Sequence, residues 1–127
     1  MELQYREVLA SDEGLPDEGR DLLRRHAVRI WTSFEGPIQV GHCEVIPATG
    51  EIFGIQVLAS HRRRGIGTEL LRLAAIALRA SGCTRIWVDA PRDQTLAAYH
   101  FYAARGWKQT GQVTGKGPYS GEILELP

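Results

Sequence analysis

The sequence predicts an α/β fold: a mixed, mostly antiparallel sheet of six or seven strands, flanked by helices, with a central strand-helix-strand crossover. Three observations predict it. The first half of the chain holds short segments in which apolar and polar residues alternate between turn residues. From Ile66 onward, apolar residues recur at helical spacing instead. A further strand pattern follows that helix, and this order indicates a parallel pair of strands with a crossover.

Four strands are expected in the first half of the chain. They cover Leu3–Ala10, Val28–Glu35, Ile38–Ile46 and Glu51–Ala59. The last of these is the most apolar, as expected of a strand buried on both faces. A short helix is expected around Leu22, within the polar connection that follows the first strand.

The second half alternates helices and strands. A helix beginning at Ile66 ends near Gly82, a residue suited to a C-terminal cap. The next elements are a strand at Thr84–Ala90, a helix at 95–105 and two strands within 107–113 and 121–126. A Gly/Pro-rich loop joins the last two strands. No repeat or linker interrupts the chain, so residues 1–127 are predicted to form a single domain.

Composition narrows the function classes. The chain has 127 residues, with 43% apolar and 24% charged residues, values typical of globular proteins. It has 15 basic and 15 acidic residues, so its formal net charge is zero. This balance, together with the lack of interleaved basic and aromatic residues, argues against nucleic acid as a partner. An anion site must therefore be local.

The cysteines and the start of the chain bear on location. Cys43 and Cys83 make no disulfide framework and have no metal-ligand spacing with the histidines, so we expect reduced thiols and no metal. The first residues lack a basic region followed by an apolar run, as in a signal peptide. No apolar run approaches the roughly 20 residues that span a bilayer. The sequence therefore predicts a soluble, cytoplasmic protein without a membrane partner.

One junction favours phosphate binding. In Ser60–Leu71, "SHRRRGIGTELL", three arginines precede a Gly-x-Gly and then an apolar helix. A helix start offers unpaired N–H groups and the positive end of the helix dipole. Glycines let a ligand approach the backbone. The pattern alone is weak, because the same residues also suit a solvated basic turn that caps a helix.

A second motif makes the pattern specific. The segment "TLAAYHFYAARGW" carries Ala98, Tyr102, Gly106 and Trp107 at spacings that resemble the Asn-x-x-Ala-x-x-x-Tyr-x-x-x-Gly-Phe helix of the GNAT superfamily of N-acetyltransferases. The first junction resembles that family's strand, Arg/Gln-x-x-Gly-x-Gly/Ala turn and helix. The resemblance covers about residues 28–126. It implies the GNAT fold and a direct transfer of an acetyl group from acetyl-CoA to an amine.

Three features depart from the family pattern. Thr95 stands where the family usually has Asn, which weakens a polar contact to the cofactor. The region between the first two strands is short where the family has two helices that wall the acceptor site. The sequence also ends almost at its last expected strand. An open acceptor site, or one completed by a partner subunit, is therefore expected.

The resemblance implies how acetyl-CoA would be held as co-substrate. The strand before the turn would pair with the pantetheine arm. Backbone N–H groups of the turn, with its arginines, would bind the pyrophosphate. A backbone N–H near Ile55 or Val57 would stabilise the oxyanion. The cofactor-binding residues are Ile55, Gln56, Val57, Arg62, Arg63, Arg64, Gly65, Ile66, Gly67, Thr68 and Thr95.

Several groups are candidates for the general base. Glu51 is the first, because its spacing before Arg62 and the "EI" pair resemble the histone-acetyltransferase branch. Alternation places it on one face with Phe53, Ile55 and Val57, where partial desolvation would raise its pKa. An exposed hairpin residue is the plain alternative.

Weaker candidates for the base lie on neighbouring strands. Asp89 comes second, at the end of the strand beyond the crossover, and a turn or cap role fits it equally. His42 and Glu44 are weaker options, and proton loss through ordered water needs no single base.

Tyr102 is the candidate general acid. It occupies the family's tyrosine position, from which a phenol would protonate the departing thiolate. Unperturbed pKa values of about 10 for Tyr and about 8.5 for a thiol make that step uphill unless positioning helps. A packed aromatic residue on an amphipathic helix is the alternative.

A non-catalytic acetyl-CoA-binding regulatory module is the competing function. Thr95 and the short N-terminal region leave it open. The acceptor, a small molecule or a protein amine, is not specified by the sequence. The resemblance also implies a homodimer.

Overall fold

The structure is a computed structural model, and it describes residues 2–8, 27–91, 97–115 and 121–126. The chain divides into two compact units, Met1–Thr84 and Arg85–Pro127. Among the described residues, no helix is long and apolar enough to cross a membrane.

The first unit is an antiparallel meander with one helix. Its strands are β1 (Leu3–Val8), β2 (Arg29–Glu35), β3 (Ile38–Ile46) and β4 (Glu51–Val57). Each pairs antiparallel with the next. A single 3-10 turn, Ala59–His61, follows β4 and leads into α2 (Ile66–Ala80).

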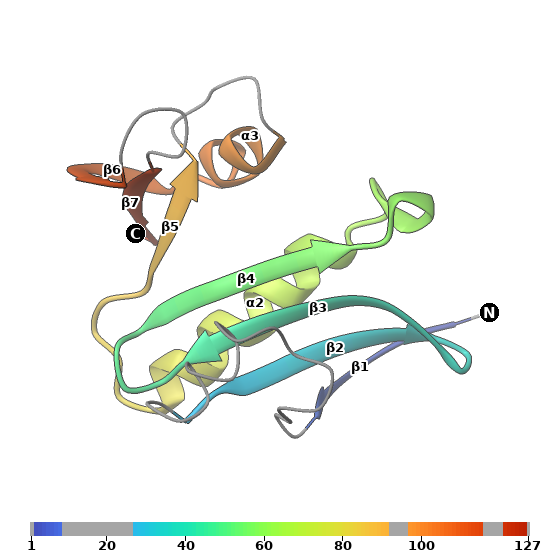
Figure 1. The fold of residues 1–127 in the computed structure, drawn as a ribbon. Helices are drawn as coiled ribbons and strands as arrows, with labels where there is room; N and C mark the ends of the chain where they lie inside the picture. Colours follow the sequence, from blue (N-terminus) through green and yellow to red (C-terminus); the bar gives the residue numbers. More distant parts are fainter. Residues whose placement is uncertain (1, 9–26, 92–96, 116–120, 127) are drawn as a thin grey trace. The chain divides into compact units, whose positions relative to one another are not determined.

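Helix α2 covers one face of this meander, as Figure 1 shows. The helical repeat expected from the sequence supplies its buried side, where Leu70, Ala74 and Leu78 are fully buried. Facing them are the buried strand residues Cys43 and Val45. A Cβ atom at Gly41 would lie 3.1 Å from Leu70 Cδ1 and 3.2 Å from Ile66 Cγ2, so Gly41 marks the side of β3 that faces the helix.

The second unit holds the remaining elements. They are β5 (Trp87–Pro91), α3 (Ala97–Ala104), β6 (Lys108–Thr114) and β7 (Gly121–Glu125). Strand β7 pairs antiparallel with both β5 and β6, so it lies between them. The core of the second unit includes Tyr102, Trp107 and Ile123.

Most expected elements are confirmed, and the differences lie at their ends. The described residues form seven strands, the first of which ends at Val8, and the chain leaves β4 at Val57 to make the 3-10 turn. The strand expected from Thr84 begins at Trp87 instead. The helix expected around Leu22 lies outside the described residues, as does most of the Gly/Pro-rich loop after β6. The single-domain assignment stays a prediction.

Candidate functional site

The turn after β4 is pinned to the sheet and then opens toward solvent. Leu58 donates its N–H to the Val40 carbonyl at 2.9 Å, and His61 donates to the Leu58 carbonyl at 2.8 Å. Arg63 follows with φ of 63°, a left-handed conformation that costs a non-glycine residue roughly 1–2 kcal/mol. The rest of the turn therefore holds Arg63 in a conformation that a non-glycine residue disfavours. Backbone strain of this kind clusters at functional sites.

The N-terminus of α2 is open to an anion. Its N-cap is Gly65 with φ of 80°, and no side chain caps the helix. The bond from Glu69 N–H to the Gly65 carbonyl, at 3.0 Å, is the first of the α-helical pattern. The amides of Ile66 and Gly67 precede it and have no carbonyl one turn earlier in the helix. Among the described residues, nothing lies within 4 Å of a Cβ atom built on Gly65, so a ligand can approach here.

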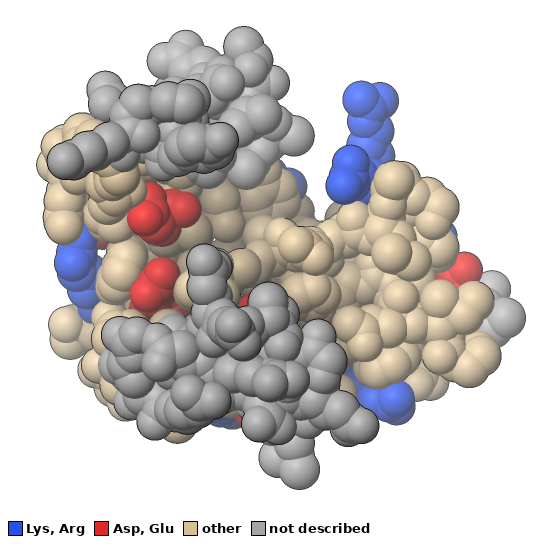
Figure 2. Space-filling view, viewed as in Figure 1, with Lys and Arg blue, Asp and Glu red and all other residues tan. Residues whose placement is uncertain are grey.

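The three arginines of the turn have different surroundings. Arg62 Nε donates to the Val57 carbonyl at 3.3 Å. Arg64 Nη2 donates to Glu35 Oε2 at 2.9 Å, which partly neutralises its charge. The exposed Arg63 makes no ion pair with any described residue, and Figure 2 shows basic side chains projecting from the surface near this turn.

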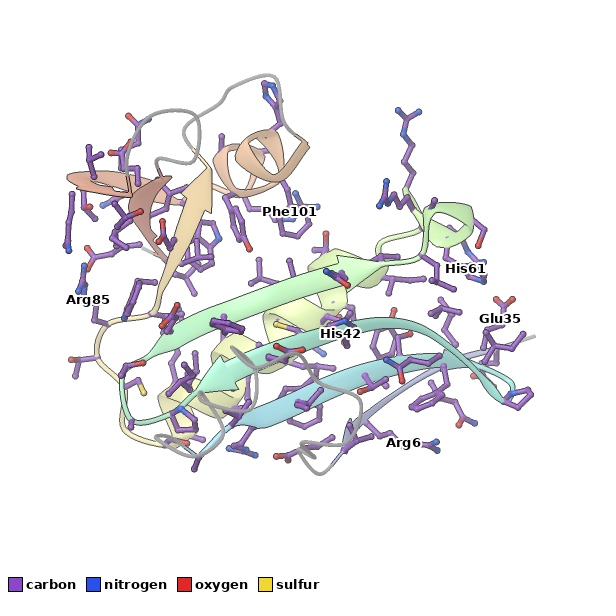
Figure 3. The ribbon with its side chains drawn as sticks, in the orientation of Figure 1. Arg6, Glu35, His42, His61, Arg85 and Phe101 are labelled. Carbon is purple, nitrogen blue, oxygen red and sulfur yellow. The ribbon has the colours of Figure 1, made fainter. Side chains whose placement is uncertain are left out.

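Glu35 organises this corner of the unit. Besides Arg64, its carboxylate contacts His61 Nε2 at 3.3 Å (Figure 3). Ser60 Oγ lies 2.7 Å from His61 Nδ1. The hydrogen bond from Arg64, and then that from His61, holds the pKa of Glu35 below its usual range. The sequence did not indicate a role for Glu35. It ends β2, far in sequence from the turn that it contacts, and nothing near it in the sequence marks it as a partner of Arg64 or His61.

Strand β4 contains a β-bulge that the sequence did not reveal. Glu44 pairs with Gly54, while Val45 pairs with Ile52, so Phe53 is the extra residue. Such bulges re-aim the side chains that follow and are frequent next to active sites.

The bulge corrects the predicted face of β4. Paired residues lie on the same side of a sheet. Ile55 and Val57 pair with Cys43 and Gly41, on the side of α2, whereas Glu51 pairs with Ile46 on the opposite side. The prediction that Glu51 shares a face with Ile55 and Val57 is therefore wrong, since an extra residue reverses the alternation.

The remaining residues of this strand lie on the side away from α2. Gln56 pairs with His42, and Gly54 with Glu44. His42 Nε2 lies 3.3 Å from Gln56 Oε1, and His42 Nδ1 lies 3.1 Å from Glu44 Oε1. Glu51 is partly exposed, and its N–H donates to Thr49 Oγ1 at 3.3 Å. The structure thus brings the first unit's carboxylate and imidazole candidates for the base onto one face.

The candidate acid belongs to the second unit. Tyr102 is 4% exposed, and its ring makes edge contacts with Phe101 and Trp107 at 5.2 Å between centroids. These contacts fix the orientation of the ring by packing.

Asp89, the second candidate base, also lies in this unit. Its Oδ1 accepts a hydrogen bond of 2.7 Å from Thr114 Oγ1. A Cβ atom at Gly121 would clash with that oxygen and would lie 2.9 Å from the Ala90 backbone carbonyl, so the close packing favours glycine there. Asp89 therefore has a structural role between its strand and β6. Thr95 lies outside the described residues.

Comparison with known protein families identifies the family of this chain. A family model described as the acetyltransferase (GNAT) family matches residues 3–107, most of the chain. The chain belongs to the GNAT acetyltransferase family. The match includes the β4 turn, α2 and the second motif as far as Trp107.

Solved structures share the GNAT fold. A GNAT-family acetyltransferase structure from Desulfovibrio desulfuricans has a TM-score of 0.76 at 17% identity, covering 98% of each chain. A GNAT acetyltransferase from Elizabethkingia anophelis, solved with acetyl-CoA bound, has a TM-score of 0.71 at 13% identity and covers 98% of this chain and 97% of that one. The predicted α/β fold class is confirmed.

One curated relative is similar over part of the chain. It is an aminoglycoside N(6')-acetyltransferase type 1 from Acinetobacter haemolyticus, 33% identical over 64 residues. The similarity covers 50% of this chain and 43% of that protein, less than half its length.

Proposed function

We propose that the protein transfers the acetyl group of acetyl-CoA to an amine. The open N-terminus of α2, at the end of a strand and beside exposed arginines, carries this proposal. It suits a pyrophosphate because backbone N–H groups and the helix dipole attract phosphate oxygens. No Gly-Lys-Ser/Thr ending follows the glycines, so the turn differs from a P-loop, which also binds Mg²⁺. Family membership and the acetyl-CoA complex of a structural neighbour support acetyl-CoA as the co-substrate.

We assign the turn to the phosphates and β4 to the pantetheine arm. The phosphate-binding residues would be Arg62, Arg63, Arg64, Gly65, Ile66, Gly67 and Thr68, with Thr95 as a further contact. Arg63 is the arginine best placed to gain from a phosphate, because its charge lacks an ion-pair partner among the described residues. Arg64 would bind phosphate only by sharing or releasing Glu35. Ile55, Gln56 and Val57 would line the arm, with a backbone N–H of Ile55 or Val57 as oxyanion donor.

The bond changes define what the protein must supply. Acetyl-CoA supplies an activated acyl group as a thioester. The amine nitrogen forms a bond to the thioester carbonyl carbon, and the carbon–sulfur bond breaks with its electron pair on sulfur. The amine gives up protons, one of which ends on the thiol.

We propose Tyr102 as the proton donor to sulfur and Glu51 or Asp89 as a base. The motif position of Tyr102 supports the first role. The partial exposure of Glu51 supports the second better than the structural bond of Asp89 does. An amine acceptor is supported by the aminoglycoside acetyltransferase that half of the chain resembles.

Acetyl transfer to a panel of amines tests the function. The panel comprises an aminoglycoside, a polyamine, a lysine peptide and a free peptide N-terminus, with acetylated product measured by mass spectrometry. We expect turnover with at least one class. Acetyl-CoA binding without turnover across the panel would favour the regulatory module instead.

Tyr102→Phe tests the acid. We expect kcat to fall on the order of 100-fold with unchanged acetyl-CoA affinity, because the phenyl ring keeps the packing and removes the proton. Tyr5→Phe, on β1, is the matched control. An unchanged kcat would assign Tyr102 to packing alone.

We also propose a cytoplasmic location and a homodimer. Cys43 and Cys83 are both free thiols, as in a reducing compartment. Size-exclusion chromatography coupled to light scattering measures the oligomeric state of the protein.

A further inference from the structure

A row of polar side chains crosses β3 and β4 on the face away from α2. His42 stands at its centre, with Nδ1 3.1 Å from Glu44 Oε1 and Nε2 3.3 Å from Gln56 Oε1 (Figure 3). The side chains of His42 and Glu44 are 27% and 26% exposed, so solvent or a ligand reaches both. Gln56 belongs to the strand that we assign to the pantetheine arm.

Glu44 decides which ring nitrogen of His42 exchanges a proton. A carboxylate only accepts hydrogen bonds, so Nδ1 keeps its hydrogen and donates it to Glu44. The proton of Nε2 is then the one that leaves and returns. The amide of Gln56 suits both states, because its oxygen accepts from a protonated Nε2 and its NH₂ group, after rotation, donates to a neutral one. This is how a carboxylate orients a catalytic imidazole.

The electrostatics of this face agree with such a role. The hydrogen bond to Glu44 raises the pKa of His42 above its ordinary value, against the opposing effect of partial burial. A base whose pKa approaches the working pH is the more effective one. Among the described strand residues, the other charged side chains on this face are Glu51 on β4 and Arg6 on β1. Arg6 lies over the Phe34 ring at 4.1 Å from its centroid.

The described residues leave space beside the pair. Among them, a Cβ atom built on Gly54 would meet only Glu44 Oε2 within 4 Å, at 3.8 Å. The bulge at Phe53 interrupts the ladder at the same place. Thr32, paired with His42, is 1% exposed, and its Oγ1 has no hydrogen-bond partner among the described residues. A buried hydroxyl without a partner requires an explanation, and a bound polar group or water supplies one.

We propose that His42, in place of Glu51 or Asp89, accepts the proton of the acceptor ammonium, that Glu44 positions the imidazole, and that the space over Gly54 receives the amine. This inference rests on the proposed acetyl transfer. The ammonium gives one proton to Nε2, which makes the imidazolium and a neutral amine. The amine then attacks the thioester carbon, and the carbon–sulfur bond breaks with its electron pair on sulfur. The second proton lost by the nitrogen balances the proton that sulfur takes up, and the imidazolium returns the first proton to solvent.

A pair of acceptors separates this role from a structural one. A simple alkylamine is protonated near neutral pH, whereas an alkoxyamine is largely neutral and needs no base before attack. In His42→Asn, we expect kcat/KM to fall on the order of 100-fold for the alkylamine and little for the alkoxyamine. Gln39→Ala, an exposed position on the same strand, should leave both unchanged.

Glu44→Gln gives an independent readout through the pH profile. Below the pKa of His42 the imidazole is already protonated and accepts nothing, so kcat/KM rises with pH through that pKa. Removing the Glu44 carboxylate lowers the pKa of His42, so the rise of kcat/KM on the acidic side of the pH profile should move to lower pH.

Gly54→Ala fills the space beside the pair. It should raise the KM of the amine, while the calorimetric Kd of acetyl-CoA stays unchanged.

The outcomes distinguish the two proposals. Equal losses for both acceptors in His42→Asn, or no loss, would overturn the role of His42 while leaving acetyl transfer intact. An unchanged pH dependence of kcat/KM in Glu44→Gln would also overturn the role of His42. Acetyl-CoA binding by the wild type without transfer to any amine would overturn the proposed function and this inference with it.

Discussion

At the scale of single residues, the two thiols of this chain should differ sharply in reactivity. Burial, and then the nearby charge of Glu44, raises the pKa of Cys43 to about 12. Only the thiolate is nucleophilic, so Cys43 is inert at neutral pH in the folded state. Cys83 is part-exposed, with its Sγ donating to the Pro47 carbonyl at 3.1 Å.

Thiol labelling checks this difference. We expect a disulfide reagent to modify Cys83 first in the native protein and both thiols in denaturant, as located by peptide mass spectrometry. Equal labelling rates in the native protein would show that Cys43 is exposed by local opening.

Glu35 should make stability depend on acid pH. Its pKa lies below the ordinary value because it accepts hydrogen bonds from Arg64 and His61. Its contribution is therefore present above the ordinary carboxyl pKa of about 4.3 and is lost as pH falls through the lower, folded-state pKa.

Denaturant unfolding of Glu35→Gln across pH tests the sign. The variant should be less stable than wild type near pH 6, and the difference should shrink as the pH falls. Glu2→Gln, at an exposed position that makes no ion pair with the described residues, is the control and should give a small, flat difference. A gap that widens in acid would contradict the assignment.

At the scale of elements, α2 is held by its buried side. Leu78 is fully buried, whereas Ile76 on the same helix is 49% exposed. Leu78→Ala should lower the free energy of unfolding by about 2–5 kcal/mol, because a cavity remains in the core. Ile76→Ala should cost far less. The two free energies from urea unfolding measure the contrast, and similar values would mean that α2 packs differently.

Element type could be predicted from the sequence, but element register could not. The change from alternation to helical spacing at Ile66 reflects which side chains are buried, so it located α2 correctly. The bulge at Phe53 has no such signal, because one extra residue leaves composition unchanged and reverses every later side chain. This is why Glu51 was expected on the wrong face.

The site was predictable only where local chemistry defines it. The strand, glycine turn and helix start are contiguous in sequence, so the phosphate-binding turn could be proposed from them alone. The contacts of Glu35 with Arg64, and of His42 with Glu44 and Gln56, join different strands. They depend on tertiary pairing that single-sequence reasoning does not provide.

At the scale of the whole molecule, zero net charge means that anion affinity must come from one place. The chain carries 15 basic and 15 acidic residues. A general attraction for polyanions is therefore weak, and a change confined to the α2 turn should remove most of the affinity for a phosphate-bearing ligand. Two glycines at opposite ends of α2 allow a matched comparison.

Calorimetric titration of acetyl-CoA into wild type, Gly65→Glu and Gly82→Glu tests the central claim most directly. Both glycines have left-handed backbones, with φ of 80° and 91°, and no atom of the part of the chain that the structure describes lies within 4 Å of a Cβ atom built on either one. The backbone strain of the two substitutions is therefore similar. Only Gly65 adjoins the proposed phosphate site. We expect a Kd on the order of 10 μM or tighter for wild type and Gly82→Glu, and a loss of at least about tenfold in Gly65→Glu. No binding by wild type, or equal weakening in both variants, would contradict the account.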